Sequence, residues 1–153
     1  MLYDMLQTEA QANGIEVFEM PFCGKIKGLY KDSTIAINKF LRDRVEKACI
    51  LAEELGHHHT SVGNILDQTD IRNRKQELRA RQWAYERLVP LSAIVQAYYA
   101  KVNGRYEIAE YLGVTEEFLQ AAIDRYRDKF GLFATYENFI IFLDPLHVIE
   151  VIT

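Results

Sequence analysis

The residues of this chain best suited to chemistry lie in one stretch, AEELGHHHTS, from Ala52 to Ser61. On a helix, residues four positions apart lie on one face, so Glu53 and His57 can point at one metal ion. Glu54, about 100° around such a helix, can then reach a water molecule on that ion. Because carboxylates and imidazoles both bind zinc, the spacing indicates a metal site with Glu54 as general base.

The same stretch permits a second interpretation and a second register. Histidines after EELG are also typical of a solvated helix C-terminus, where they complement the negative end of the helix dipole. Glu54 and His58 are four positions apart as well, so the register is open. Three adjacent histidines cannot all bind one ion from a regular helix. We therefore treat His58, His59 and Asp67 only as additional candidates beside the ion.

A helix over 41–58 must position this stretch. Its apolar residues recur at spacings of three and four, which predicts one buried face. A short helix over 3–12 precedes it and ends at the NG pair. Segments 15–20, 27–32 and 33–39 have the composition of strands, and KDS provides a hairpin turn between the last two. We expect a small antiparallel sheet packed on this candidate metal-site helix.

The second half of the chain is predicted to be mainly helical. After a turn-rich loop over 60–70, the expected helices are 71–89, which Pro90 ends, 91–102, and two helices within 104–131. Thr115 follows the Gly113 joint and can N-cap the last helix. The aromatic segment 132–152, with a turn at EN, predicts a β-hairpin. The predicted fold class is α+β, with the small sheet and the candidate metal-site helices in one part over 1–102 and a helical and β-hairpin part over 103–153 packed on the same domain.

Composition narrows the classes of function. The chain has 153 residues, a net charge of −4 and 49% hydrophobic residues, as expected for one globular domain without a general attraction to nucleic acid or anionic membranes. No secretory signal or membrane-length apolar run is present in the sequence, so we expect a cytoplasmic protein. Cys23 and Cys49 lack a CxxC spacing and are expected to be reduced.

A second motif lies in IAEYLGVTEEFLQAAI, residues 108–123, which has the A-x-x-L-G-V spacing of a helix-turn-helix. Its second helix would offer two glutamates and an aspartate to DNA, and no basic residue before Arg125. Acidic side chains repel phosphates, so a structural helical pair or a protein-binding surface is favoured over DNA binding.

Two strings resemble the ImmA/IrrE family of metallo-endopeptidases, which is common in phages and mobile elements of Gram-positive bacteria. The strings are ACILAEELGHHHTS and RKQELRARQWAYERLVP, the latter over 74–90. Members pair an HExGH helix with a later helix, whose pattern is matched here by Glu77, Ala80, Trp83, Ala84, Leu88 and Pro90. The segment KGLYKDSTIAINK resembles the family's strand pair, so the similarity covers roughly residues 15–90.

The resemblance implies a function and a third ligand. Glu77 would complete a zinc site with Glu53 and His57, where Glu53 replaces the first histidine of HExxH. An additional carboxylate makes the ion a poorer Lewis acid, so a harder ion such as Mn²⁺ is an alternative to Zn²⁺. The implied substrate is a helix-turn-helix repressor. Two alternatives stay open: a peptidase-like module that binds a repressor or antitoxin without turnover, and a DNA-binding regulator that uses residues 106–126.

Overall fold

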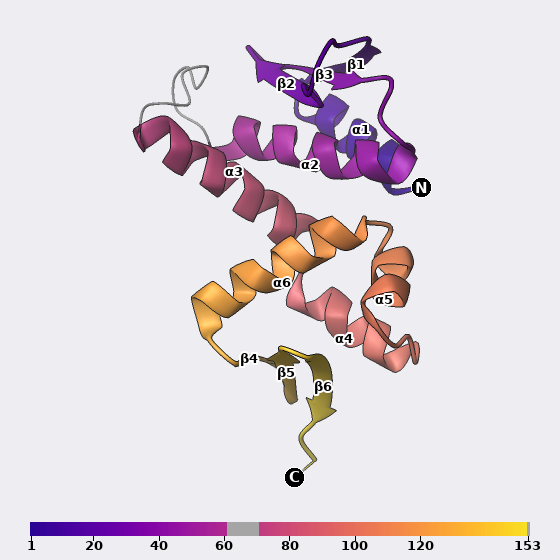
Figure 1. Cartoon of the computed structure of the whole chain (residues 1–153), viewed down its shortest axis with the longest axis vertical. Coiled ribbons are helices and arrows are strands. Elements are labelled where there is room, and N and C mark those ends of the chain that lie inside the picture. Colours follow the sequence, from indigo (N-terminus) through magenta and orange to yellow (C-terminus); the bar gives the residue numbers. More distant parts are fainter. Residues whose placement is uncertain (61–70, 153) are drawn as a thin grey trace. The chain divides into compact units, whose positions relative to one another are not determined.

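The computed structural model describes residues 1–60 and 71–152, with the side chains of the second range from Arg74 onward. The chain forms two compact units, Met1–Ala84 and Tyr85–Thr153, and the boundary between them lies within one helix, α3 (Figure 1). Each unit has its own sheet, and each is described by itself below.

The first unit is built around a buried helix and a sheet of three strands. Its core consists of apolar side chains from α1, β3 and α2, among them Leu6, Ile35 and Leu55, which are fully buried. Alternate strand positions and helix positions three or four apart supply these side chains, as the sequence pattern predicts. The elements are α1 (Leu2–Ala12), β1 (Glu16–Met20), β2 (Gly28–Lys31), β3 (Thr34–Asn38), α2 (Arg44–Thr60) and the greater part of α3 (Ile71–Leu88).

The sheet of this unit has the strand order β1-β3-β2. β2 and β3 form the expected antiparallel hairpin, in which Asp32 and Ser33 both have positive φ, as a tight two-residue turn requires. β1 pairs with β3 in parallel, which corrects the expectation of a purely antiparallel sheet. The reason is topological: β1 joins the hairpin beside β3 and not beside β2, and β3 runs opposite to β2.

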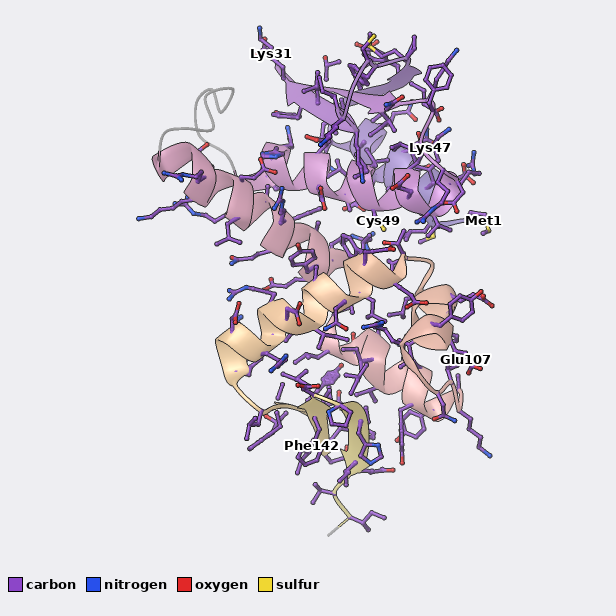
Figure 2. All side chains as sticks on the ribbon, viewed as in Figure 1. Met1, Lys31, Lys47, Cys49, Glu107 and Phe142 are labelled. Carbon is purple, nitrogen blue, oxygen red and sulfur yellow. The ribbon has the colours of Figure 1, made fainter. Side chains whose placement is uncertain are left out.

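Glu19 of β1 links its strand to two helices of this unit, α1 and α2. Its Oε1 accepts a hydrogen bond of 2.8 Å from Lys47 of α2, which is labelled in Figure 2, and its Oε2 accepts one of 2.8 Å from Tyr3 of α1. The Lys47 hydrogen bond is the main cause that lowers the pKa of Glu19. The strand is thereby fixed to α1 and to α2, the helix that carries the candidate site.

The second unit begins with the end of α3 and continues with three shorter helices. Their bounds are α4 (Leu91–Tyr99), α5 (Arg105–Leu112) and α6 (Glu116–Phe130). Gly113 ends α5 in the left-handed conformation, and Thr115 caps α6 by accepting a 3.0 Å hydrogen bond from the amide of Phe118, as predicted. The units divide the chain between 84 and 85, whereas the sequence led us to expect a division between 102 and 103.

A three-stranded antiparallel sheet closes the described chain. Its strands are β4 (Phe133–Tyr136), β5 (Phe139–Leu143), which carries Phe142 (Figure 2), and β6 (Leu146–Glu150). The predicted hairpin is the β4–β5 pair, and β6 adds a third strand. Two helical units with separate small sheets confirm the α+β class. Within the described residues, no helix is both long and apolar enough to cross a membrane.

Candidate metal centre

Helix α2 carries the chemical residues near its C-terminal end. Glu53 and Glu54 are half-buried, and the side chain of His57 is buried, with 4% of its surface exposed. The helix continues to Thr60, so Glu53 and His57 are one turn apart on a regular helix, as the spacing requires. His57 is therefore not part of a solvated helix C-terminus, because it is buried. Buried polar side chains rarely lack a partner, so His57 is expected to have one.

The approach of α3 to α2 depends on a glycine. A Cβ atom added at Gly56 would lie 2.2 Å from the backbone oxygen of Ala80, far inside van der Waals contact. Both residues are fully buried or nearly so, and only the absence of a side chain at 56 allows the two backbones to meet. This contact brings the next residues of α2 to the level of Glu77 on α3.

His57 and Glu77 are thereby brought together. The Nε2 atom of His57 lies 2.9 Å from Oε2 of Glu77, and the second oxygen of Glu77, Oε1, lies 3.5 Å from Nε of Arg81. Burial alone would lower the pKa of His57, but the Glu77 hydrogen bond and the carboxylates of Glu54 and Glu53 outweigh it and raise the pKa. Two of the three expected ligands therefore meet across the helix pair.

Glu54 has the properties of a proton carrier. Burial raises its pKa from 4.5 to about 7, with further contributions from Glu53 and Glu77 and an opposing one from His57. The Cγ of Glu54 packs on the start of β2, where a Cβ added at Gly28 would lie 3.3 Å from it. A carboxyl group that is half protonated near neutrality can both accept and return a proton.

Glu53 is less accessible than an ordinary surface glutamate. Burial raises its pKa, Arg81 is the strongest opposing influence, and Glu77 adds to the rise. Arg81 of α3 thus acts on Glu53 of α2 as well as on Glu77. A positive side chain of α3 therefore acts electrostatically on the position where the sequence departs from the family motif.

The other histidines lie on a different side of α2. His58 Nδ1 is 2.8 Å from the hydroxyl of Tyr30 on β2, and the exposed ring of His59 stacks on Trp83 of α3 at a centroid distance of 4.7 Å. Neither of these two contacts involves His57 or Glu77. Asp67, the remaining candidate, lies outside the described residues.

The types of donor in the site fit a divalent cation, since one imidazole and two carboxylates are ordinary ligands of zinc and manganese. Two of the three proposed ligands are in contact in the structure. His57 and Glu77 are in contact, but among the described residues no group of three or more histidines, cysteines, aspartates or glutamates is gathered as a ligand set. The assignment of Glu53 as the third ligand stays a prediction.

Comparison with known proteins decides the family. A family model described as the IrrE N-terminal-like domain of peptidase M78 matches residues 10–124, three quarters of the chain. The chain belongs to this family. No curated protein and no solved structure matches it. The IrrE-like match includes α2, α3, α5 and the first part of α6, so the residues that meet at His57 and Glu77 belong to a peptidase-like domain.

The sequence alone did not identify three residues that shape this IrrE-like site. They are Arg81, whose i, i+4 spacing from Glu77 was a usable signal, Gly28, and Tyr30. Gly28 and Tyr30 carry no signal of their own, because their role comes from the packing of β2 on α2. Gly56 was expected on the buried stripe, but the backbone contact with Ala80 was not.

Proposed function

We propose that this chain is a metal-dependent endopeptidase of the IrrE-like type. The observation that supports it most is the 2.9 Å contact between His57 and Glu77, which joins two helices inside a peptidase-like domain. Glu54 lies three residues before His57, as the general base of an HExxH helix does.

Each residue of the site has a distinct role in this proposal. Glu53, His57 and Glu77 would hold Zn²⁺ or Mn²⁺. When bound, such an ion supplies a Lewis acid that polarises the scissile carbonyl. Glu54 takes a proton from the attacking water and passes it to the leaving amine, and its pKa of about 7 suits both steps near neutral pH.

Glu53 makes this site a weak one. A carboxylate in place of a neutral imidazole adds one negative charge to the ligands, which reduces the Lewis acidity that the site can exploit. We therefore expect slower hydrolysis than a site with two histidines would give, and this same feature favours the main alternative, a peptidase-like module that binds its partner without turnover.

The proposed substrate is a helix-turn-helix repressor that the same phage or mobile element encodes. Its support is the family resemblance of the site together with the match over 10–124. In the alternative, the same repressor or an antitoxin would be the bound partner.

The test compares the untagged wild-type chain with Glu53→His and Glu54→Gln, each assayed for metal content and for cleavage of the neighbouring repressor by gel and mass spectrometry. We expect about one ion per wild-type chain, faster cleavage by Glu53→His, and no cleavage by Glu54→Gln at unchanged metal content. The physical reason is that Glu54 acts on water and Glu53 acts on the ion.

Two results would contradict the proposal. If Glu53→Ala kept full metal occupancy and Glu53→His changed neither binding nor rate, Glu53 would not be a ligand. If the wild-type chain bound the repressor in a stable complex and no variant cleaved it, the non-catalytic module would replace the enzyme.

A further inference from the structure

The charge of the site is unusual for its family. An HExxH helix with a glutamate on the later helix carries two carboxylates, whereas Glu53, Glu54 and Glu77 give this site three. All three are partly buried, and burial of negative charges costs free energy. A compensating positive charge is therefore expected close to them, on the same pair of helices.

Arg81 is placed to supply that charge. It lies one turn after Glu77 on α3 and approaches Glu77 Oε1 at 3.5 Å, on the oxygen that does not contact His57. Glu53 lies one turn before His57 on α2, and α2 and α3 run in broadly opposite directions (Figure 1). The charge of Arg81 also acts on Glu53, because it is the strongest influence that opposes the rise in the pKa of that carboxyl.

We propose that Arg81 is the charge partner of Glu53, so that a glutamate at 53 and an arginine at 81 together take the place of one neutral histidine. The inference rests on the proposed metal site. In a site with two neutral histidines, the two positive charges of a divalent ion balance two carboxylates. Here three carboxylates balance against the ion and Arg81.

The proposal has two consequences that differ in sign. Without metal, Arg81 stabilises the fold by offsetting Glu53 and Glu77. With metal, Arg81 would oppose binding, because its positive charge repels a cation and its guanidinium already lies 3.5 Å from Glu77 Oε1. Loss of Arg81 should therefore weaken the metal-free fold and strengthen metal binding, a combination that a general structural defect does not produce.

The first experiment is a double-mutant cycle on chelator-treated protein, with wild type, Arg81→Gln, Glu53→Gln and the double variant. We expect Arg81→Gln to lower the Tm by about 3 °C when residue 53 is glutamate and by much less when it is glutamine. Arg79→Gln, which removes the same charge from an exposed position of the same helix, is the matched control. Equal losses in both backgrounds, or an equal loss for Arg79→Gln, would overturn the proposal.

The second experiment measures zinc affinity by competition with a chromophoric chelator. We expect Arg81→Gln to bind zinc about tenfold more tightly than wild type, and Arg81→Lys, which keeps the charge, to bind as wild type does. Equal affinities for the glutamine and lysine variants would show that charge is not the cause. If no variant bound zinc, the proposed metal site would fail, while the metal-free cycle would still decide whether Arg81 and Glu53 are partners.

Discussion

Gly56 and Ala80 bring the backbones of α2 and α3 into direct contact, with no space for a single methyl group between them. We predict that Gly56→Ala is severely destabilising, because a Cβ at 2.2 Å from the Ala80 oxygen forces the helices apart. The expected loss is about 3 kcal/mol or more in urea unfolding of the metal-free protein.

The control for this variant is Gly104→Ala. Nothing lies within 4 Å of a Cβ added at Gly104, so its positive φ of 86° is the only penalty, and we expect about 1 kcal/mol. Equal losses at 56 and 104 would show that the close contact is not what makes Gly56 necessary.

Glu54→Gln should stabilise the metal-free protein in a way that depends on pH. Because folding raises the pKa of Glu54 from 4.5 to about 7, its favourable contribution is present below pH 4.5 and is lost as the pH rises through 7. The gain at pH 8 is on the order of 3 kcal/mol. Chemical unfolding at pH 4 and pH 8 measures it, and a gain of the same size at both values would contradict the assignment.

His57→Ala and His59→Ala separate the two registers of the metal site. His57 contacts Glu77 and His59 stacks on Trp83, so we expect His57→Ala to lose the bound ion and His59→Ala to keep it. Metal analysis of the two purified variants is the measurement. The opposite outcome would move the site to the end of α2 and remove Glu53 from it.

We predict that the stability of the second unit falls at alkaline pH as Tyr126 ionises. Its hydroxyl donates a 2.9 Å hydrogen bond to the Val89 carbonyl, and burial, with a smaller effect of Glu86, raises its pKa to about 12. The stability it adds is present below pH 10 and lost as the pH rises through 12. Tyr126→Phe should cost about 1 kcal/mol at pH 7 and less above pH 11. A pH-independent loss would show that ionisation of Tyr126 is not involved.

The helix pair α5 and α6 should not bind DNA. On α6, Asp124 and Asp128 are exposed, while Arg105 of α5 is already bonded to Gln120 at 2.6 Å and to Glu116 at 3.4 Å. Phosphates would meet negative charge on this surface. A gel-shift assay of the full chain at low salt tests this, and retention that is sensitive to salt and to DNA sequence would support a DNA-binding regulator instead.

The helices were predictable because each is amphipathic over several turns and is bounded by a recognisable signal, such as Thr115 at the start of α6 or Pro90 between α3 and α4. The strands were predictable as strands, and the two hairpins as hairpins, but the partner of β1 was not. Alternation in 16–20 does not reveal whether that segment pairs with β2 or with β3, because a strand alternates between its two faces whichever neighbour it has. The third C-terminal strand was missed because only the turn at Glu137 and Asn138 was taken into account.

The site was predictable where spacing within one helix determines it. Glu53, Glu54 and His57 follow from helical geometry, whereas Glu77 needed the resemblance to a family, because no local rule links α2 to α3. The influence of Arg81 on Glu53 depends on how two helices cross. The crossing of α2 and α3 depends on the close backbone contact at Gly56. A single glycine in a helical sequence does not indicate which backbone segment it will contact.

The parallel pairing of β1 with β3 has a consequence for how the chain folds on the ribosome. β1 is synthesised first, yet the strand with which it pairs, β3, emerges after the whole of β2. The hairpin of β2 and β3 closes through a two-residue turn, which is a fast local step, while β1 must close a longer loop. The strand made first is therefore paired last, and until then nascent chains expose an open edge of β3 to one another.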